Sequence, residues 1–358
     1  MKFNRFSVLV AAVLIYSTAC NPYKIEIPHW PYEDPDWVDD GSYDVPVFDP
    51  EAAGSPLVYP SATEKREKAL VTSGYFSTTA IDDGLRLYRF TKSCDVTNAN
   101  QDVYVLELDL DNPGYRVYFH WGGNTTSGAC KNLNAIAGVN GTYEKDAVYV
   151  RAQGVNKTEV SIESGHLRYW KHNGAIVGDG GRQIALVNGS GRFGAHTAEA
   201  GDNAIALYKS LPEPNIFAAA PMLIDDYNPV GTTFVPDYLT SSDLNKLEYE
   251  DFRRHQGVRH PRTAYALTDD NYLLLVVVDG RTNKAKGMTA KELTKFIQKH
   301  FNPRWALNMD GGGSSAMYVK GMGNKDNILN NYTDTDDATG APVERSVNSH
   351  LIIQKVAK

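Results

Sequence analysis

The sequence is poor in the residues that several common kinds of site require. It contains three cysteines in 358 residues, and none belongs to a Cys-x-x-Cys pair or lies near clustered histidines, which argues against zinc binding and redox catalysis. No segment concentrates Lys and Arg: 36 basic residues stand against 43 acidic ones, a net charge of -7, so we expect no nucleic-acid partner. There is no internal repeat. The remaining composition, 42% hydrophobic, is that of a globular protein with a large core.

The first 20 residues predict an export signal. Lys2 and Arg5 precede the apolar run 6–16, in which Ser7 is the one small polar residue. This run is too short for a membrane-spanning helix, which needs about 20 residues, so we interpret it as a targeting segment. It ends in Ser-Thr-Ala-Cys at Cys20, a pattern that resembles the lipobox of bacterial lipoproteins. Ordinary signal cleavage is the alternative.

We therefore expect Cys20 to carry lipid and to anchor the chain to a bacterial membrane, in the periplasm or at the cell surface. The substitution Cys20→Ser should release the protein from the membrane fraction. Unchanged fractionation would contradict lipidation.

Residues 21–60 predict an extended tether between this anchor and a folded domain over 61–358. The segment holds eight of the 17 prolines and nine acidic residues against one lysine. Proline at this density removes backbone donors and fixes φ, which favours an extended chain.

Cys94 and Cys130 are the two cysteines that remain after Cys20. An even pair in an exported chain predicts a disulfide, and two separate buried thiols are the alternative.

Strand-length apolar or alternating runs recur from about residue 64 onward. They cover 85–90, 103–108, 115–119, 136–139, 147–150, 184–187, 205–208, 265–267, 272–278, 306–309 and 351–356. One helix is clearly signalled: Thr289 and Glu292 form a capping box, and apolar residues follow at helical spacing up to His300. The pattern predicts an α+β protein, a β-rich single domain of mixed, largely antiparallel sheets flanked by a few helices. The polar stretch 225–259 is expected to be a surface excursion.

The segment Asn-Met-Asp-Gly-Gly-Gly-Ser-Ser over 308–315 is the most informative one. A strand that ends in Asp310 and continues into three glycines exposes backbone N–H groups with no Cβ in the way, so an anionic ligand can approach the main chain. A tight structural turn is the alternative. The residues that this segment adds to the predicted binding site are Gly311, Gly312, Gly313, Ser314 and Ser315.

Further polar groups stand at the ends of other predicted strands. Arg262 precedes one strand and Asp279 and Arg281 follow the next, so a hairpin would bring the two arginines to one end of the sheet. Arginine binds phosphate or carboxylate through two parallel hydrogen bonds, although a salt bridge between Arg262 and Asp279 is the simpler alternative. Three more candidates for ligand binding lie near strand ends, namely Asn140, Glu144 and Arg345.

These segments, in this order, resemble the phosphodiester glycosidase family. The resemblance rests on Val-Asn-Gly-Thr-Tyr at 139–143, Pro-Arg-Thr-Ala at 261–264, Val-Asp-Gly at 278–280, Gly-Met-Thr at 287–289, the glycine block at 307–314, and Arg-Ser-Val at 345–347. It covers about residues 70–356. Glu144 departs from the family, which usually has an aromatic residue there. The resemblance implies a hydrolase that cleaves a sugar-1-phosphate diester between the sugar carbon and the oxygen, without an organic cofactor.

The residues themselves suit such chemistry. The leaving phosphate gains negative charge as the bond breaks, so arginines and a turn of N–H groups would bind the transition state more tightly than the ground state. A carboxylate is also needed near the sugar, and Asp310 and Asp279 are the candidates, with Arg262 as the catalytic arginine. Two other readings stay open: a glycan-binding surface lipoprotein without turnover, and a structural calcium site formed by Asp334, Asp336 and Asp337.

Overall fold

Three antiparallel sheets form the framework of the protein in the computed structural model, which describes residues 63–144, 147–158, 166–189 and 198–356. The predicted signal with Cys20 and the predicted tether 21–60 lie outside the described residues. The largest sheet has seven strands, in the order β1 (Phe76–Asp82), β2 (Leu85–Cys94), β3 (Ala99–Asp109), β13 (Tyr272–Val278), β12 (Arg262–Leu267), β14 (Trp305–Asn308) and β11 (Met222–Ile224).

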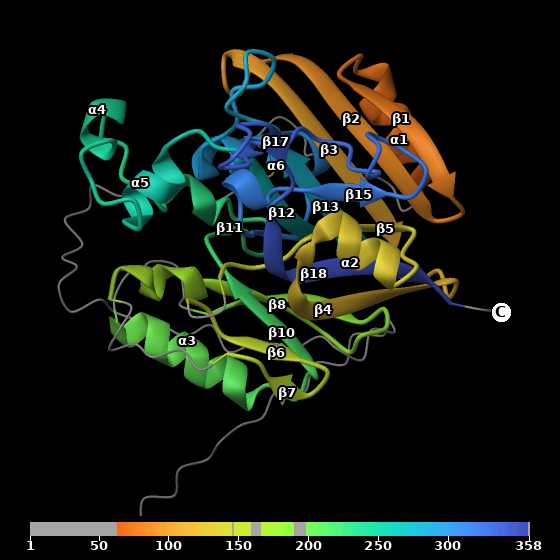
Figure 1. Cartoon of the computed structure of the whole chain (residues 1–358), viewed down its shortest axis with the longest axis horizontal. Helices are drawn as coiled ribbons and strands as arrows, with labels where there is room; N and C mark the ends of the chain where they lie inside the picture. The colour runs from red at the N-terminus through yellow and green to blue at the C-terminus, as the bar shows by residue number, and fades with distance from the viewer. Residues whose placement is uncertain (1–62, 145–146, 159–165, 190–197, 357–358) are drawn as a thin grey trace, which may run out of the picture.

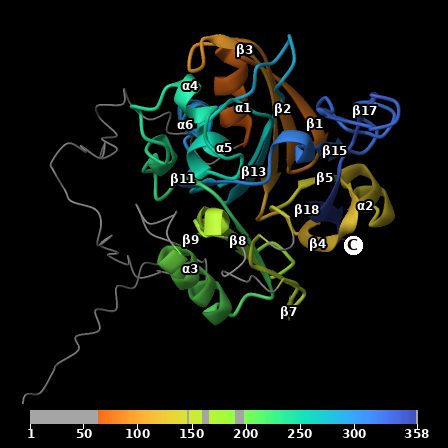
Figure 2. The same cartoon turned by 60° about the vertical axis from the view of Figure 1, so that its left-hand side comes forward.

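Two smaller sheets pack beneath the first one. The five-stranded sheet runs β7 (Val155–Asn156), β6 (Val150–Ala152), β10 (Asn215–Ala219), β8 (Gly174–Gly178) and β9 (Ile184–Asn188), and the four-stranded sheet runs β15 (Met317–Val319), β5 (Ala137–Asn140), β18 (Ser346–Lys355) and β4 (Tyr115–Thr125). Figure 1 shows the large sheet in the upper half and the five-stranded sheet in the lower half, and Figure 2 shows the four-stranded sheet beside them. Every pairing between described strands is antiparallel, which confirms the predicted fold class.

The helices lie around these sheets. They are α1 (Thr63–Thr72), α2 (Thr126–Asn132), α3 (Ala198–Ser210), α4 (Ser241–Leu244), α5 (Phe252–Gly257) and α6 (Ala290–Phe301), with 3-10 turns η2 (His166–His172), η3 (Val230–Thr232) and η4 (Gly312–Ser314) and a small ribbon of β16 (Asp334–Thr335) and β17 (Pro342–Val343). No described helix is long and apolar enough to cross a membrane.

The central strand β13 is buried on both faces, as its unbroken apolar sequence predicts. Leu273, Leu275 and Val277 point into the core that the large sheet shares with the two smaller ones, whereas Leu274 and Val276 point into a second core on its other face. Successive side chains of a strand alternate between faces, so a strand between two cores must be apolar throughout. This burial holds the ends of β12, β13 and β14 at one fixed edge.

Helix α6 covers the second core. The predicted capping box is confirmed: the Thr289 hydroxyl accepts from the amide of Glu292, whose carboxylate accepts from the amide of Thr289. The strands predicted at 272–278 and 306–309 both form, as β13 and β14, and α6 connects them. β12 lies between β13 and β14 and pairs with both, so the helix connects two strands that are not neighbours.

Two of the predicted strands are wrong. Residues 205–208 belong to helix α3, in which Ala200, Ala204 and Tyr208 recur every four residues on the buried face. A four-residue apolar run has the same appearance in a helix and in a strand, so it cannot distinguish them. Of the run 147–150, only Val150 is in a strand.

The predicted disulfide is wrong as well. Cys94 and Cys130 are both free thiols and both buried. Cys94 ends β2 and packs in the core under α6, whereas Cys130 lies in α2 and packs in a third core against β15 and β18. The alternative of two separate buried thiols is therefore the one that the fold adopts.

Candidate active site

A cleft of about 280 Å³ lies where strand ends of the large and four-stranded sheets meet η2 and the excursion 225–259. The predicted site residues that line it are Glu144, Arg262, Arg281, Asp310, Gly311, Gly312, Gly313, Ser314 and Arg345. Three predicted site residues, Asn140, Asp279 and Ser315, do not line it. The segment 225–259 is not only a surface excursion, because it contributes Tyr249, Glu250 and His255 to the cleft.

The glycine turn after β14 is packed so closely that an added Cβ would force its neighbours to move. A Cβ on Gly313 would lie 2.7 Å from Nη2 of Arg345, and one on Gly312 would lie 3.3 Å from Nη2 of Arg281. A Cβ on Gly311 would lie 2.8 Å from the carbonyl oxygen of Pro261. Two guanidinium groups therefore rest directly on the turn at Gly312 and Gly313, and this favours a ligand site over a simple structural turn.

The amides of this turn are less available than the sequence suggests. The amide of Gly312 donates to the carbonyl of Pro261, and those of Ser314 and Ser315 donate to the carbonyls of Gly311 and Gly312. At most the amides of Gly311 and Gly313 can therefore face a ligand. The two arginines, not the backbone, supply most of the positive charge at this end of the cleft.

Both of these arginines are exposed, and each is hydrogen-bonded to neighbouring side chains through part of its guanidinium group. The Arg345 Nε donates to Asp334 at 2.7 Å, and its Nη1 lies 3.4 Å from the Ser314 hydroxyl. Arg281 places Nη2 3.0 Å from Nδ1 of His260. Because a guanidinium only donates, Nδ1 of His260 is the acceptor. Each arginine therefore keeps N–H groups free to bind an oxyanion in the cleft.

Asp310 stands at the start of the turn, in the same cleft. Burial raises the pKa of its carboxyl to about 6, with the Ser314 hydroxyl lowering it, Glu144 raising it, and Lys171 and Arg345 lowering it. The carboxyl is thus able to exchange a proton near neutral pH, as an acid or base in catalysis must.

Asn140 and Ser315 support the turn from below. The Asn140 amide donates to the carbonyl of Asp310 at 2.8 Å, and its oxygen accepts from the Thr263 hydroxyl and from the amide of Ala316. The Ser315 hydroxyl is also 3.2 Å from the Thr263 hydroxyl. Both residues were predicted to bind substrate, and the structure gives them a supporting role instead.

Arg262 lines the cleft with a guanidinium that is committed to the protein. It is 1% exposed, and it donates from Nε to the carbonyl of Met288 and from Nη1 to the Gln256 side chain. Its Nη2 donates to the carbonyls of His255 and Val258. No salt bridge joins it to Asp279 among the described residues. Arg262 therefore anchors the C-terminal end of helix α5, and the expectation that it grips a phosphate is not supported by this geometry.

We predict that Arg262→Met lowers stability by about 3 kcal/mol, since several buried carbonyls would lose their donor. Thermal unfolding would measure this loss. The control is Arg281→Met, which removes an exposed arginine of the same cleft and should leave the melting temperature nearly unchanged. An unchanged melting temperature for Arg262→Met would contradict the anchoring role.

Asp279 lies behind the cleft. Its carboxylate is 1% exposed and accepts from the amide and the side-chain nitrogen of Asn331, at 3.0 and 2.6 Å. Burial raises its pKa to about 7, and these hydrogen bonds oppose the rise. Because it does not line the cleft, it cannot touch a substrate there, and Asp310 is the better candidate for the catalytic carboxylate.

Lys171 is a cleft residue that the sequence did not reveal. It belongs to η2 and is 1% exposed, with Nζ 2.9 Å from the carboxylates of both Glu144 and Glu250 and 4.7 Å from the centre of the Tyr143 ring. This arrangement gives the Glu144 carboxylate a positively charged partner. No local pattern around Lys171 signals such a role, since its partners come from two distant segments.

Two histidines complete the cleft, and both are neutral. Burial and the neighbouring Arg262 and Arg281 lower the pKa of His260 to about 3, and burial together with Arg262 holds the pKa of His255 well below its usual range. A protonated histidine would add charge beside the arginines, so these rings serve as neutral hydrogen-bonding and packing groups.

The contacts of Asp334 and Asp336 do not support the alternative of a structural calcium site at Asp334, Asp336 and Asp337. Asp334 pairs with Arg345, and Asp336 accepts from the amides of Ala338 and Thr339. In the part of the chain that the structure describes, no group of three or more His, Cys, Asp or Glu side chains is arranged to hold a metal ion.

The chain belongs to the phosphodiester glycosidase family, whose sequence profile matches residues 134–354. A curated relative, the SPbeta prophage-derived uncharacterized protein YomE of Bacillus subtilis (strain 168), is 25% identical over 240 residues. That match covers 62% of this chain and 32% of the relative, so the chain spans about a third of that protein's length.

Two solved structures share the fold. The catalytic domain of zebrafish N-acetylglucosamine-1-phosphodiester alpha-N-acetylglucosaminidase has a TM-score of 0.50 and 15% identity, and the match covers 79% of this chain and 84% of that one. A hypothetical protein from Synechocystis has a TM-score of 0.51 and 14% identity, with 79% and 64% covered. At these identities the likeness concerns the fold alone.

Proposed function

We propose that this protein is a hydrolase that cleaves the glycosidic bond of a sugar-1-phosphate diester in a glycan or glycoconjugate. The observation that carries the proposal is the placement of Arg281 and Arg345 directly on the glycine turn, beside a carboxyl, Asp310, whose pKa is near 6. Family membership is consistent with this activity.

The charges of the cleft suit both ends of such a substrate. A phosphodiester carries one negative charge, and its phosphate gains a second as the bond to the sugar breaks. Arg281 and Arg345 would bind this growing charge more tightly than the ground state, which lowers the barrier. Asp310 then faces the sugar carbon, where positive charge develops as the phosphate leaves.

The reaction consumes one water molecule. The bond between the sugar C1 and the phosphate oxygen breaks, and its electron pair leaves with the phosphate. Water forms the new bond to C1 and loses a proton, for which the Asp310 carboxylate is the acceptor that the cleft offers. The products are a free reducing sugar and a phosphate monoester.

The experiment that tests the proposal uses a panel of sugar-1-phosphate diesters, in both anomers, in water labelled with a heavy oxygen isotope. Mass spectrometry of both products should find the label in the sugar and none in the phosphate monoester. Label in the phosphate would mean cleavage at phosphorus and would overturn the glycosidase assignment. Binding without turnover across the panel would favour the glycan-binding lipoprotein instead.

The substrate would be met outside the cytoplasm if the predicted lipid anchor at Cys20 is correct. Carbohydrate is then the partner of the cleft, and the membrane is a partner only through the lipid.

A further inference from the structure

The carboxyl group of Asp279 is buried and does not line the cleft, which leaves its purpose unexplained by the reaction. It follows β13 directly, and its main contacts are the amide and side-chain nitrogen of Asn331. Asp102 and Arg89 lie within electrostatic reach from the neighbouring strands, and they oppose one another, Asp102 raising and Arg89 lowering the pKa of Asp279. Burying a carboxylate is costly, so a site that keeps one is expected to use it.

Asn331 belongs to a segment that we call the arm, residues 330–334, which lies along the glycine turn. The Asn330 side chain accepts from the amide of Met317 and donates to the carbonyl of Ser315, both at 2.8 Å. The Thr333 hydroxyl donates to the carbonyl of Gly312 at 3.3 Å. Asp279 thus holds the middle of the arm, and the arm holds both ends of the turn.

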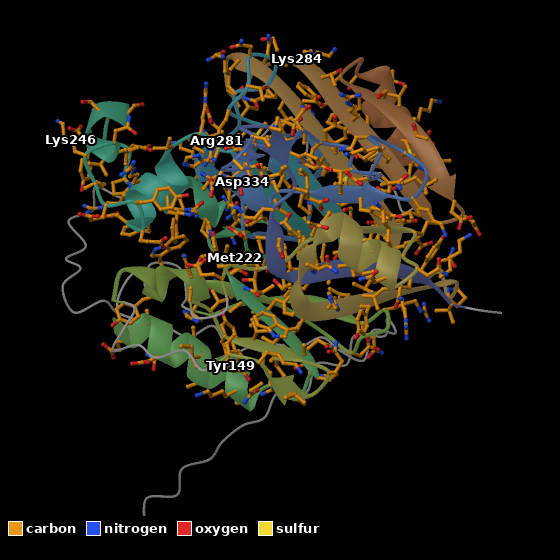
Figure 3. The ribbon with its side chains drawn as sticks, viewed as in Figure 1. Tyr149, Met222, Lys246, Arg281, Lys284 and Asp334 are labelled. Carbon is orange, nitrogen blue, oxygen red and sulfur yellow. The ribbon has the colours of Figure 1, made fainter. Side chains whose placement is uncertain are left out.

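The arm ends in Asp334, which binds Arg345. Asp334 begins the ribbon β16–β17, and this ribbon returns the chain so that Arg345 Nε lies 2.7 Å from the Asp334 carboxylate. Figure 3 labels Asp334 and Arg281, which lie near one another at this end of the cleft. Arg345 in turn reaches the Ser314 hydroxyl, which hydrogen-bonds the carboxylate of Asp310.

We propose that Asp279 is a positioning residue, which fixes Arg345 over the glycine turn through Asn331 and the arm. This rests on the proposed function for the meaning of Arg345 but concerns a residue that touches no substrate. An exposed arginine loses side-chain entropy when it is held in one orientation, and a preorganised guanidinium binds an oxyanion more tightly than a mobile one. The arm provides this orientation, and Asp279 keeps the arm in place.

The test compares Asp279→Asn and Asn331→Ala with wild type. Asp279→Asn keeps one acceptor oxygen and places an NH2 group against one of the two Asn331 donors, and Asn331→Ala removes the side-chain donor while leaving the backbone contact. Each should lower kcat/KM for a diester substrate by about tenfold, mainly through KM, since Arg345 is no longer held. The matched control is Asp336→Asn, which removes the charge of a carboxylate that accepts from the Thr339 amide in the loop of the same ribbon and should leave kcat/KM unchanged.

A double-mutant cycle separates positioning from general support of the fold. In an Arg345→Ala background, Asn331→Ala should change kcat/KM less than twofold, because the group that it positions is gone. An effect of the same size in both backgrounds would overturn the proposal.

Hydrogen exchange gives a readout that needs no substrate. Asn331→Ala should speed amide exchange over the arm and over 344–346 and leave β12 and β13 unchanged. Unchanged exchange over the arm would overturn the inference even for an active enzyme, whereas a wild-type protein without turnover would overturn the proposed function alone.

Discussion

Replacing Asp310 with asparagine should lower kcat by about 1,000-fold while leaving substrate binding nearly intact. The substitution keeps the shape of the side chain, so the glycine turn and the two arginines stay in place. It removes the negative charge that faces the sugar carbon and the group that takes the proton of water. Rapid-mix kinetics and calorimetric binding of an uncleaved phosphonate analogue would measure the two effects separately.

The pH dependence provides a second test of the same residue. Because burial raises the pKa of Asp310 to about 6, the carboxylate is present above that pH and lost below it. We expect kcat/KM of the wild type to rise with pH through an apparent pKa near 6, and this limb to be absent from Asp310→Asn.

Stability distinguishes this role from a structural one. A carboxyl whose pKa is raised by folding contributes stability at low pH that is lost as the pH rises through the folded-state pKa. Above that pH the asparagine variant should therefore unfold at the same temperature as the wild type or higher. A lower melting temperature with an unchanged rate per folded molecule would mean that Asp310 only braces the turn.

The parts of the fold that were predictable from sequence have strong local signals. Strand β13 follows from a continuous apolar run, as a strand between two cores requires, and α6 follows from its capping box and apolar spacing. The glycine turn was also identifiable, because three successive glycines are entropically costly and need a reason. Asp310 was a good candidate for the site because it directly precedes these glycines at the end of a strand.

The parts that were not predictable depend on contacts between distant segments. Arginine is a residue type that often binds phosphate, but the partners of Arg262 are carbonyls of the 255–258 turn, whose position no local pattern specifies. Lys171 is a cleft residue only because Glu144 and Glu250 meet it there. Cys94 and Cys130 form an even pair by count, yet the cores that hold them lie in different layers. Asp279 was predicted to be a catalytic carboxylate, but its side chain points to the arm and does not line the cleft.

Placing a methyl group on Gly313 should lower kcat/KM on the order of 100-fold without unfolding the protein. The new Cβ would lie 2.7 Å from Nη2 of Arg345, at the far end of a flexible and exposed side chain. The guanidinium can move away at little cost in stability, but it then no longer lies on the turn where the phosphate would bind. The effect should therefore appear in turnover and in binding of a phosphonate analogue, with a nearly unchanged melting temperature.

The neighbouring glycine provides the matched comparison. Gly312 has a φ of 62°, so Gly312→Ala adds backbone strain of about 1 kcal/mol to the crowding of Arg281 and should lower the melting temperature as well. If Gly313→Ala acted only through the backbone, the double variant Gly313→Ala with Arg345→Ala would be much worse than Arg345→Ala alone. If Gly313→Ala acts by displacing the arginine, as the packing requires, the double variant and Arg345→Ala alone should have the same kcat/KM. The activity lost in Gly313→Ala would then come from moving this guanidinium away from the turn.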